Sequence, residues 1–92
     1  MNIILYFSDQ QRYDTIHPQV TPNILSMEDE SILFDNAFTC QPVCGPARAC
    51  IQTGVYATQN NCFINGISMD KDNPDTLAKV LNRNGYNTSY IG

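Results

Sequence analysis

The sequence predicts an α/β fold with mostly parallel strands and flanking helices. Three observations predict it. A continuous apolar run at residues 3–7 has the pattern of a strand that is covered on both faces. Helical segments bounded by proline and glycine follow, and apolar segments of strand type alternate with them. The resulting order, strand, helix, strand, helix, helix, strand, is typical of a layered α/β arrangement.

The first half of the chain is predicted to form a strand, a helix and a second strand. The strand at residues 3–7 leads directly into the polar residues 8–12, which therefore lie at its carboxyl end, where open α/β sheets place their ligand crevices. Thr21 and Pro22 have the character of a helix N-cap and first residue, which predicts a short helix reaching about Glu30. Residues 32–38 are predicted to form the second strand.

The second half is predicted to form two helices and a third strand. Pro46 and Gly54 bracket a helix over residues 46–53, with Cys44 just before it. Residues 55–73 are rich in Asn, Gln and Asp and are predicted to be an irregular surface loop. A further helix is expected to open at Asn73 and Pro74 and to end at Gly85, before a strand at residues 86–91; its side chains Leu77, Val80 and Leu81 are expected in the core.

Composition limits the possible functions. The chain has 92 residues and a formal net charge of −4, which argues against electrostatic capture of nucleic acid or of an anionic membrane surface. Any anionic substrate must then be held locally, by a metal ion or a placed arginine. No export signal or membrane anchor is visible at the start of the sequence, so we expect a cytoplasmic protein with reduced cysteines. Because the four cysteines form no CxxC motif, a structural zinc site is a weak interpretation.

The segment from Cys40 to Gly54 contains the residues best suited to chemistry. Cys44 lies at the predicted start of a helix, where unpaired N–H groups and the helix dipole stabilise a thiolate or a bound oxyanion. Arg48, expected in the first turn, adds a positive charge whose fork geometry suits sulfate or phosphate. Gly45 permits close approach of a ligand to the backbone. These features predict an anion pocket with a nucleophile at its rim.

The same segment resembles the sulfatase signature, in which Cys or Ser is followed by any residue, Pro, a small residue and Arg, and then by Thr and Gly. Here the signature reads Cys44, Gly45, Pro46, Ala47, Arg48, then Thr53 and Gly54. Flanking segments also resemble the family: IILYFSDQQR, TPNIL, ILFDNAFT and TLAKVLNRNGYNTSYIG. The resemblance covers essentially residues 1–92 and implies the N-terminal, incomplete part of a sulfatase catalytic domain with an alkaline-phosphatase-like fold.

The resemblance also implies a chemistry. Cys44 would be oxidised by a formylglycine-generating maturation enzyme to 3-oxoalanine (formylglycine), which attacks the sulfur of a sulfate ester. Arg48 would stabilise the developing charge. A divalent metal, usually Ca²⁺, would bind Asp9, Gln10 and the modified Cys44. The remaining family ligands, including a Lys and His motif, would follow Gly92.

Two positions depart from the common pattern. Many sulfatases have two adjacent acids after the first strand, whereas here Asp9 is followed by Gln10, whose neutral amide contributes less charge to a metal site. Relatives with this pair include phosphonate monoester and phosphodiester hydrolases, so that substrate class is the alternative to sulfate esters. Ala47 stands where Ser is common, a change that a maturation enzyme should tolerate.

Structural interpretations compete with functional ones at other positions. Cys40, Cys50 and Cys62 match no motif, so packing is the better interpretation for them. Arg12 and Asp14 are expected at most to contact one another on the surface, and His17 is expected to be an exposed loop residue.

The 92 residues by themselves are expected to be inactive, because they lack the remaining ligands and the acid for the leaving group. A third hypothesis is therefore a non-enzymatic piece that binds only an anion or a partner. Since a parallel sheet cut short leaves an unpaired edge, self-association of the chain is also expected.

Overall fold

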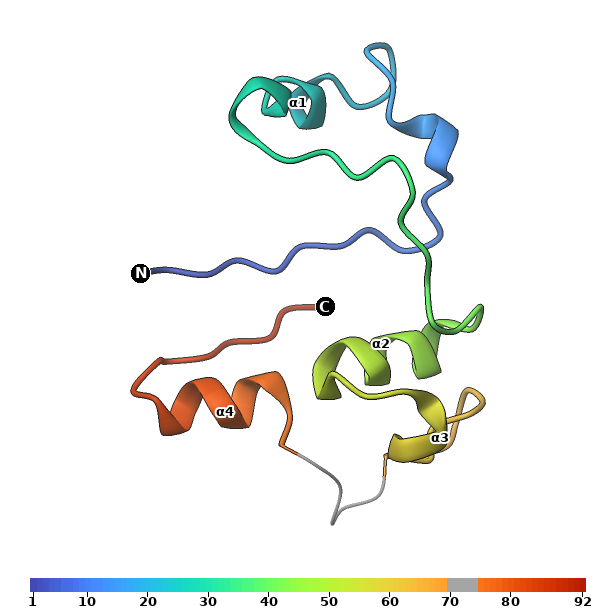
Figure 1. Ribbon diagram of the computed structural model, residues 1–92, viewed down its shortest axis with the longest axis vertical. Coiled ribbons are helices and arrows are strands. Elements are labelled where there is room, and N and C mark those ends of the chain that lie inside the picture. Colours follow the sequence, from blue (N-terminus) through green and yellow to red (C-terminus); the bar gives the residue numbers. More distant parts are fainter. Residues whose placement is uncertain (70–74) are drawn as a thin grey trace. The chain divides into compact units, whose positions relative to one another are not determined.

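The computed structural model describes residues 1–69 and 75–92. The chain divides into two compact units, Met1–Ala37 and Phe38–Gly92, which are considered separately below. Figure 1 labels their helices along the chain. The predicted opening of the last helix at Asn73 and Pro74 falls outside the described residues.

The unit Met1–Ala37 contains three short helical elements, η1 (Tyr13–Thr15), α1 (Pro22–Leu25) and η2 (Glu28–Glu30). Pro22 occupies the first position of α1, as predicted, because its fixed φ suits a helix start. The Thr21 side chain does not cap this helix; its hydroxyl donates to the Thr15 carbonyl at 3.1 Å. The single helix expected from Thr21 to Glu30 is therefore replaced by two separate turns.

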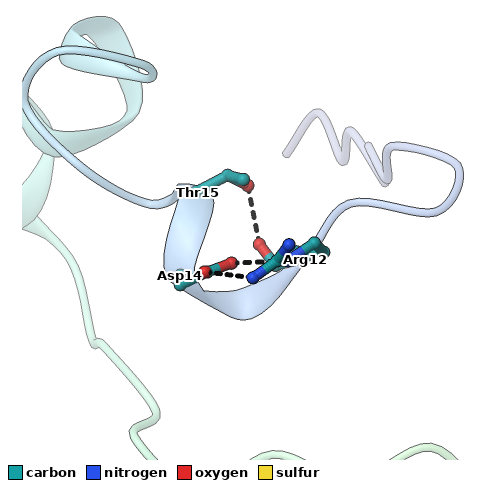
Figure 2. Close-up of polar contacts among 3 residues, drawn as sticks. All are labelled: Arg12, Asp14 and Thr15. Carbon is teal, nitrogen blue, oxygen red and sulfur yellow. Dashed lines mark hydrogen bonds and ion pairs between the residues drawn. The ribbon is translucent and has the colours of Figure 1, made fainter.

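The predicted surface contact between Arg12 and Asp14 is confirmed (Figure 2). Arg12 Nε donates to Asp14 Oδ1 at 3.0 Å, and the terminal guanidinium nitrogen donates to Oδ2 at 2.5 Å. The Thr15 hydroxyl donates to the Arg12 carbonyl at 2.6 Å, which closes the η1 turn. Both charged side chains remain exposed, so the pair stabilises the turn only weakly.

The three predicted strands are not seen: residues 1–69 and 75–92 contain no β-strand, and the α/β layering is not confirmed by the structure. Apolar side chains of these segments are exposed, Ile4 by 91% and Phe34 by 72%. A strand is defined by hydrogen bonds to a neighbouring strand, and in a parallel sheet it is covered on both faces. Without a neighbouring strand and without cover on its faces, an apolar run such as residues 3–7 stays an extended segment (Figure 1).

The unit Phe38–Gly92 contains α2 (Cys44–Thr53), α3 (Ala57–Asn60) and α4 (Leu77–Arg83), and α2 contacts both of the other helices. Gly54 ends α2 in the left-handed conformation (φ 68°), as predicted, and its N–H donates to the Cys50 carbonyl at 2.8 Å. The short helix α3 lies within the stretch that was expected to be irregular.

A buried asparagine organises the small core between α2 and α3. Asn60 is fully buried, and its Nδ2 donates to Thr53 Oγ1 at 3.4 Å and to the Val55 carbonyl at 3.4 Å. Its Oδ1 accepts from the Cys62 N–H at 2.9 Å. These bonds compensate for the loss of water around a buried amide. The other buried residues of this core are small: Pro46, Ala49, Cys50, Ala57 and Cys62.

The helix α4 has a side-chain cap at its start but is less buried than expected. The Thr76 hydroxyl accepts from the Lys79 N–H at 3.3 Å, and Gly85 after the helix has φ 83°. Leu77 and Val80 are 44% and 42% exposed, so their prediction as core residues is wrong; Leu81 is half-buried. The physical reason is that no strand covers this face among the described residues.

Among residues 1–69 and 75–92, none of the helices has the length and apolar character needed to cross a membrane.

Candidate active site at the start of α2

The nucleophile candidate Cys44 is the first residue of α2 and is exposed. It was predicted just outside a helix beginning at Pro46. The helix begins two residues earlier because the Val43 carbonyl already accepts the Ala47 N–H at 2.9 Å. Val43 provides no side-chain cap. The first N–H groups of a helix have no carbonyl partner within the helix. Because Pro46 has no N–H, Cys44 and Gly45 carry the first-turn N–H groups that need a partner from elsewhere.

The side chain of Asn65 covers this helix start. Its Oδ1 accepts the Gly45 N–H at 2.9 Å, and its Nδ2 lies 3.2 Å from the Cys44 sulfur, to which it can donate. The Cys44 thiol also lies within 3.4 Å of Oδ1. One carboxamide therefore satisfies a first-turn amide and fixes the side chain of Cys44, twenty-one positions away in sequence.

Gly45 is required by this arrangement. A Cβ atom added at position 45 would lie 2.6 Å from Asn65 Oδ1, closer than van der Waals contact allows. The group that approaches Gly45 in the structure is the Asn65 side chain and not a ligand, so the predicted approach of a ligand stays a prediction. Sequence reasoning missed Asn65, since the turn signal of the Asn65–Gly66 pair indicates a bend but no partner.

Arg48 lies in the second turn of α2, not in the first as predicted, because the helix starts at Cys44. Residues four apart share one face of a helix, so Arg48 and Cys44 lie on the same side of α2. The Arg48 side chain is half-buried and takes part in a polar or electrostatic interaction. The helix therefore carries a cation and the candidate nucleophile on one face.

Asp9 and Gln10, the predicted metal ligands, lie in the other unit and are exposed. Gln10 has a left-handed backbone (φ 52°), which marks a tight bend directly after the apolar run. Asp9 also takes part in an interaction within the structure. Asp9 and Gln10 belong to one unit and Cys44 to the other, so their approach to Cys44 stays a prediction.

The donor chemistry of these two residues suits a hard cation, since carboxylate and amide oxygens are the ligands that Ca²⁺ takes. A calcium ion binds about six to eight oxygen ligands. In the described ranges, no group of three or more His, Cys, Asp or Glu side chains could hold a metal ion. Metal binding by Asp9 and Gln10 therefore stays a prediction.

The cysteines and His17 are the remaining candidates from the sequence. All four cysteines are unpaired with one another in the structure. Cys50 and Cys62 are buried, which agrees with a packing role, whereas Cys40 is exposed and its assignment to packing is wrong. The exposed His17 accepts the Gln19 N–H on Nδ1 at 3.3 Å, as a loop residue.

Comparison with known proteins places the chain in a family. The sulfatase family model matches residues 1–92. An uncharacterised sulfatase, YidJ, of Escherichia coli is 38% identical over 99% of this chain and 19% of its own length. An ulvan-active sulfatase of Formosa agariphila is 40% identical over 99% of the chain and 19% of its own length. The multifunctional alkaline phosphatase superfamily protein PehA of Trinickia caryophylli is 32% identical over 99% of the chain and 20% of its own length.

No solved structure matches the chain. The chain spans about a fifth of the length of these curated relatives. The resemblance to the N-terminal portion of a sulfatase is confirmed by the family match and by the relatives that cover nearly the whole chain: this chain belongs to the sulfatase family.

Proposed function

We propose that the chain supplies the nucleophile half of an enzyme that hydrolyses sulfate esters, with Cys44 as the precursor of formylglycine. The observation that carries this proposal is the position of Cys44, exposed at the first residue of α2 and inside a sulfatase signature. A buried cysteine could not be reached by a maturation enzyme or by a substrate. Its exposure is therefore the minimum that the proposed role requires.

The start of α2 is suited to bind the sulfate group. The Cys44 N–H and the positive end of the helix dipole favour an anion at this end, whereas the Gly45 N–H is already donated to Asn65 Oδ1. Arg48, on the face of Cys44, adds a guanidinium whose paired donors match sulfate oxygens. These groups hold the anion next to position 44 without requiring a positive surface, which a chain of net charge −4 does not have.

Two groups absent from the encoded sequence complete the proposal. The formylglycine formed from Cys44 supplies a hydrated aldehyde as the nucleophile in place of a thiol. As the family resemblance implies, Asp9, Gln10 and residue 44 would hold a divalent cation such as Ca²⁺, which would supply positive charge to the sulfate oxygens. Within this scheme Asn65 orients the side chain of residue 44 through the contacts described above.

The test is peptide mass spectrometry and turnover of nitrophenyl sulfate by the longer sulfatase that carries this sequence, expressed with a maturation enzyme. We expect an aldehyde at position 44 and loss of turnover in Cys44→Ala. Cys40→Ala is the matched control, because Cys40 is also exposed but lies outside the signature. Active protein with an unmodified thiol at position 44 would contradict the proposal.

Phosphonate monoesters and phosphodiesters form the second candidate substrate class. The pair Asp9–Gln10 favours it, and so does the similarity to a relative described as multifunctional. Phosphonate monoesters, phosphodiesters and sulfate monoesters are all monoanions at neutral pH, so the pair favours this class through the related hydrolases that share it and not through the charge of the substrate. Comparing kcat/KM for nitrophenyl sulfate and nitrophenyl phenylphosphonate, in the parent and in Gln10→Asp, separates the two classes. A phosphonate preference that is lost in Gln10→Asp would favour the second.

We further propose that the 92 residues alone do not hydrolyse either ester, since the described part contains no cluster of metal-binding side chains. Assay of the purified chain with added Ca²⁺ tests this. Metal-dependent turnover that Cys44→Ala abolishes would refute it. If the isolated chain binds sulfate but turns nothing over, anion binding alone describes what these residues do.

A further inference from the structure

The chain contains two Asn–Gly pairs, Asn65–Gly66 and Asn84–Gly85, and the structure holds them differently. The backbone nitrogen that follows an asparagine can attack the side-chain carboxamide, and a glycine at that next position hinders the nitrogen least. Both asparagines are exposed, so accessibility does not separate them. The hydrogen bonds around each pair separate them instead.

Asn84 is held in a way that opposes this reaction. The Gly85 N–H donates to the Asn82 carbonyl at 3.1 Å, and Asn84 Nδ2 donates to the Val80 carbonyl at 2.8 Å. The attacking nitrogen must give up its proton, so an N–H that is already bonded reacts more slowly. Asn84 is therefore expected to react only after the end of α4 opens.

Asn65 lies in an exposed turn in which the next nitrogen is available. The Ile67 N–H donates to the Ile64 carbonyl at 3.4 Å, and Gly66 has φ 88°, a backbone conformation that glycine adopts readily. Among residues 1–69 and 75–92, the Gly66 N–H donates to no acceptor. Its nitrogen can therefore lose a proton without first breaking a hydrogen bond.

The Asn65 carboxamide contacts the groups that such an attack needs. Its Oδ1 accepts the Gly45 N–H at 2.9 Å and lies 3.4 Å from the Cys44 sulfur, whose thiol can donate to it. Nδ2, the nitrogen that leaves, lies 3.2 Å from the same sulfur. Donors placed at an oxygen that becomes negative lower the barrier to attack on its carbon. A thiol at hydrogen-bond distance from the leaving nitrogen can supply its proton.

We propose that Cys44 and Gly45 promote the conversion of Asn65 to aspartate and isoaspartate through a cyclic succinimide formed with Gly66. The Gly66 nitrogen gives its proton to water and forms a bond to Asn65 Cγ, and the electron pair of the C=O bond moves onto Oδ1. The carbonyl then re-forms, the Cγ–Nδ2 bond breaks, and Nδ2 leaves as ammonia with a proton from the Cys44 thiol, which regains one from water. A water molecule finally opens the ring at either carbonyl, so that one water is consumed for each ammonia released.

The product changes the surroundings of Cys44. A carboxylate at position 65 carries no N–H, so the donation from Nδ2 to the Cys44 sulfur is lost. It also places a negative charge beside residue 44, which opposes an anion there. The reaction thus affects the proposed sulfate site, but it takes place in the chain as encoded and requires neither formylglycine nor a metal ion.

The experiment incubates the chain at mildly alkaline pH and follows both asparagines by peptide mass spectrometry. Cleavage after Arg48 and Arg83 places Asn65 and Asn84 in different peptides, so Asn84 serves as an internal reference. We expect Asn65 to react about tenfold faster than Asn84 in the folded chain, because Asn84 must first break its hydrogen bonds. In a denaturing concentration of urea Asn65 should slow and the two rates should become similar. Isoaspartate at position 65 marks the cyclic route, since direct hydrolysis of the carboxamide gives aspartate alone.

Substitution of Cys44 tests the part played by its thiol. Cys44→Ala should slow the reaction of Asn65 about tenfold, less than loss of an acid from a buried active site because water also reaches this one. Cys40→Ala is the matched control, since Cys40 is an exposed cysteine outside the contact, and it should change neither rate. A Cys44→Ala chain that fails to fold would be recognised by faster reaction at Asn84, and the comparison with urea then decides alone.

Three results would each overturn the proposal. The first is an Asn65 that reacts no faster in the folded chain than in urea. The second is an unchanged rate at Asn65 in folded Cys44→Ala. The third is a product that contains aspartate but no isoaspartate at position 65.

Discussion

Replacing Asn65 by alanine removes the group that covers the start of α2. The variant loses the 2.9 Å bond to the Gly45 N–H and the contact with the Cys44 sulfur. Loss of a helix-capping side chain costs about 1 kcal/mol. Because the site is exposed, water can bond to the groups that Asn65 leaves. We therefore expect a loss of about 1 kcal/mol and not the larger cost of breaking two buried hydrogen bonds. Such a change corresponds to roughly fivefold faster local opening.

Hydrogen exchange of backbone amides, followed by NMR, measures this effect at one atom. In Asn65→Ala the amide of residue 45 should exchange about fivefold faster, and amides in the last turn of α2 should change little. Asn87→Ala is the matched control, because Asn87 is an exposed asparagine in the same unit. Unchanged exchange at residue 45 would show that the Asn65 contact does not protect this amide.

Gly45→Ala tests the same contact from the other side. Its Cβ would lie 2.6 Å from Asn65 Oδ1, so the Asn65 side chain must turn away. Exchange at residue 45 should rise as in Asn65→Ala, although alanine favours the helix by up to about 1 kcal/mol over glycine. In the double variant the two effects on residue 45 should not add, since each removes one shared contact. Additive effects would refute the reasoning.

Three further predictions concern other parts of the chain. The Cys50 side chain raises the pKa of the exposed Cys40 thiol. The stability that this shift contributes is therefore present below the ordinary pKa and is lost as the pH rises through the higher folded value. The pH profile of Cys40 alkylation should move to lower pH in Cys50→Ala, and an unmoved profile would contradict this. The exposed apolar side chains of residues 32–34 should make the chain self-associate, and light scattering that shows a monomer at high concentration would disprove it. Arg12→Ala, which breaks the exposed pair with Asp14, should lower the free energy of unfolding by no more than about 1 kcal/mol, and a larger loss in urea titration would mean that the pair has a second role.

The sequence predicted best what depends on neighbouring residues. The left-handed stops at Gly54 and Gly85 and the start of α1 at Pro22 follow from local backbone preferences, and the structure has all three. The start of α2 was misplaced by two residues, since proline at its third position is as acceptable as at its first.

What depends on distant residues could not be predicted from one sequence. A strand requires a partner, and the apolar pattern of residues 3–7 says nothing about which segment pairs with it. Asn65 contacts Cys44 across twenty-one positions, and no periodic pattern connects the two. The approach of Asp9 to Cys44 also depends on residues that are far apart in sequence, and it stays a prediction from the family resemblance.

The helical repeat of α2 explains how one short segment gives two cysteines different chemistry. Successive residues turn by about 100°, so Arg48 lies about 40° around the helix from Cys44, while Cys50 lies about 120° away. Cys44 and Arg48 therefore share a face near the helix start, whereas Cys50 points into the core beside Asn60. Moving either cysteine by one residue would turn it by a quarter of the circumference or more. The spacing of six residues thus keeps the exposed thiol proposed for maturation apart from the buried thiol of Cys50.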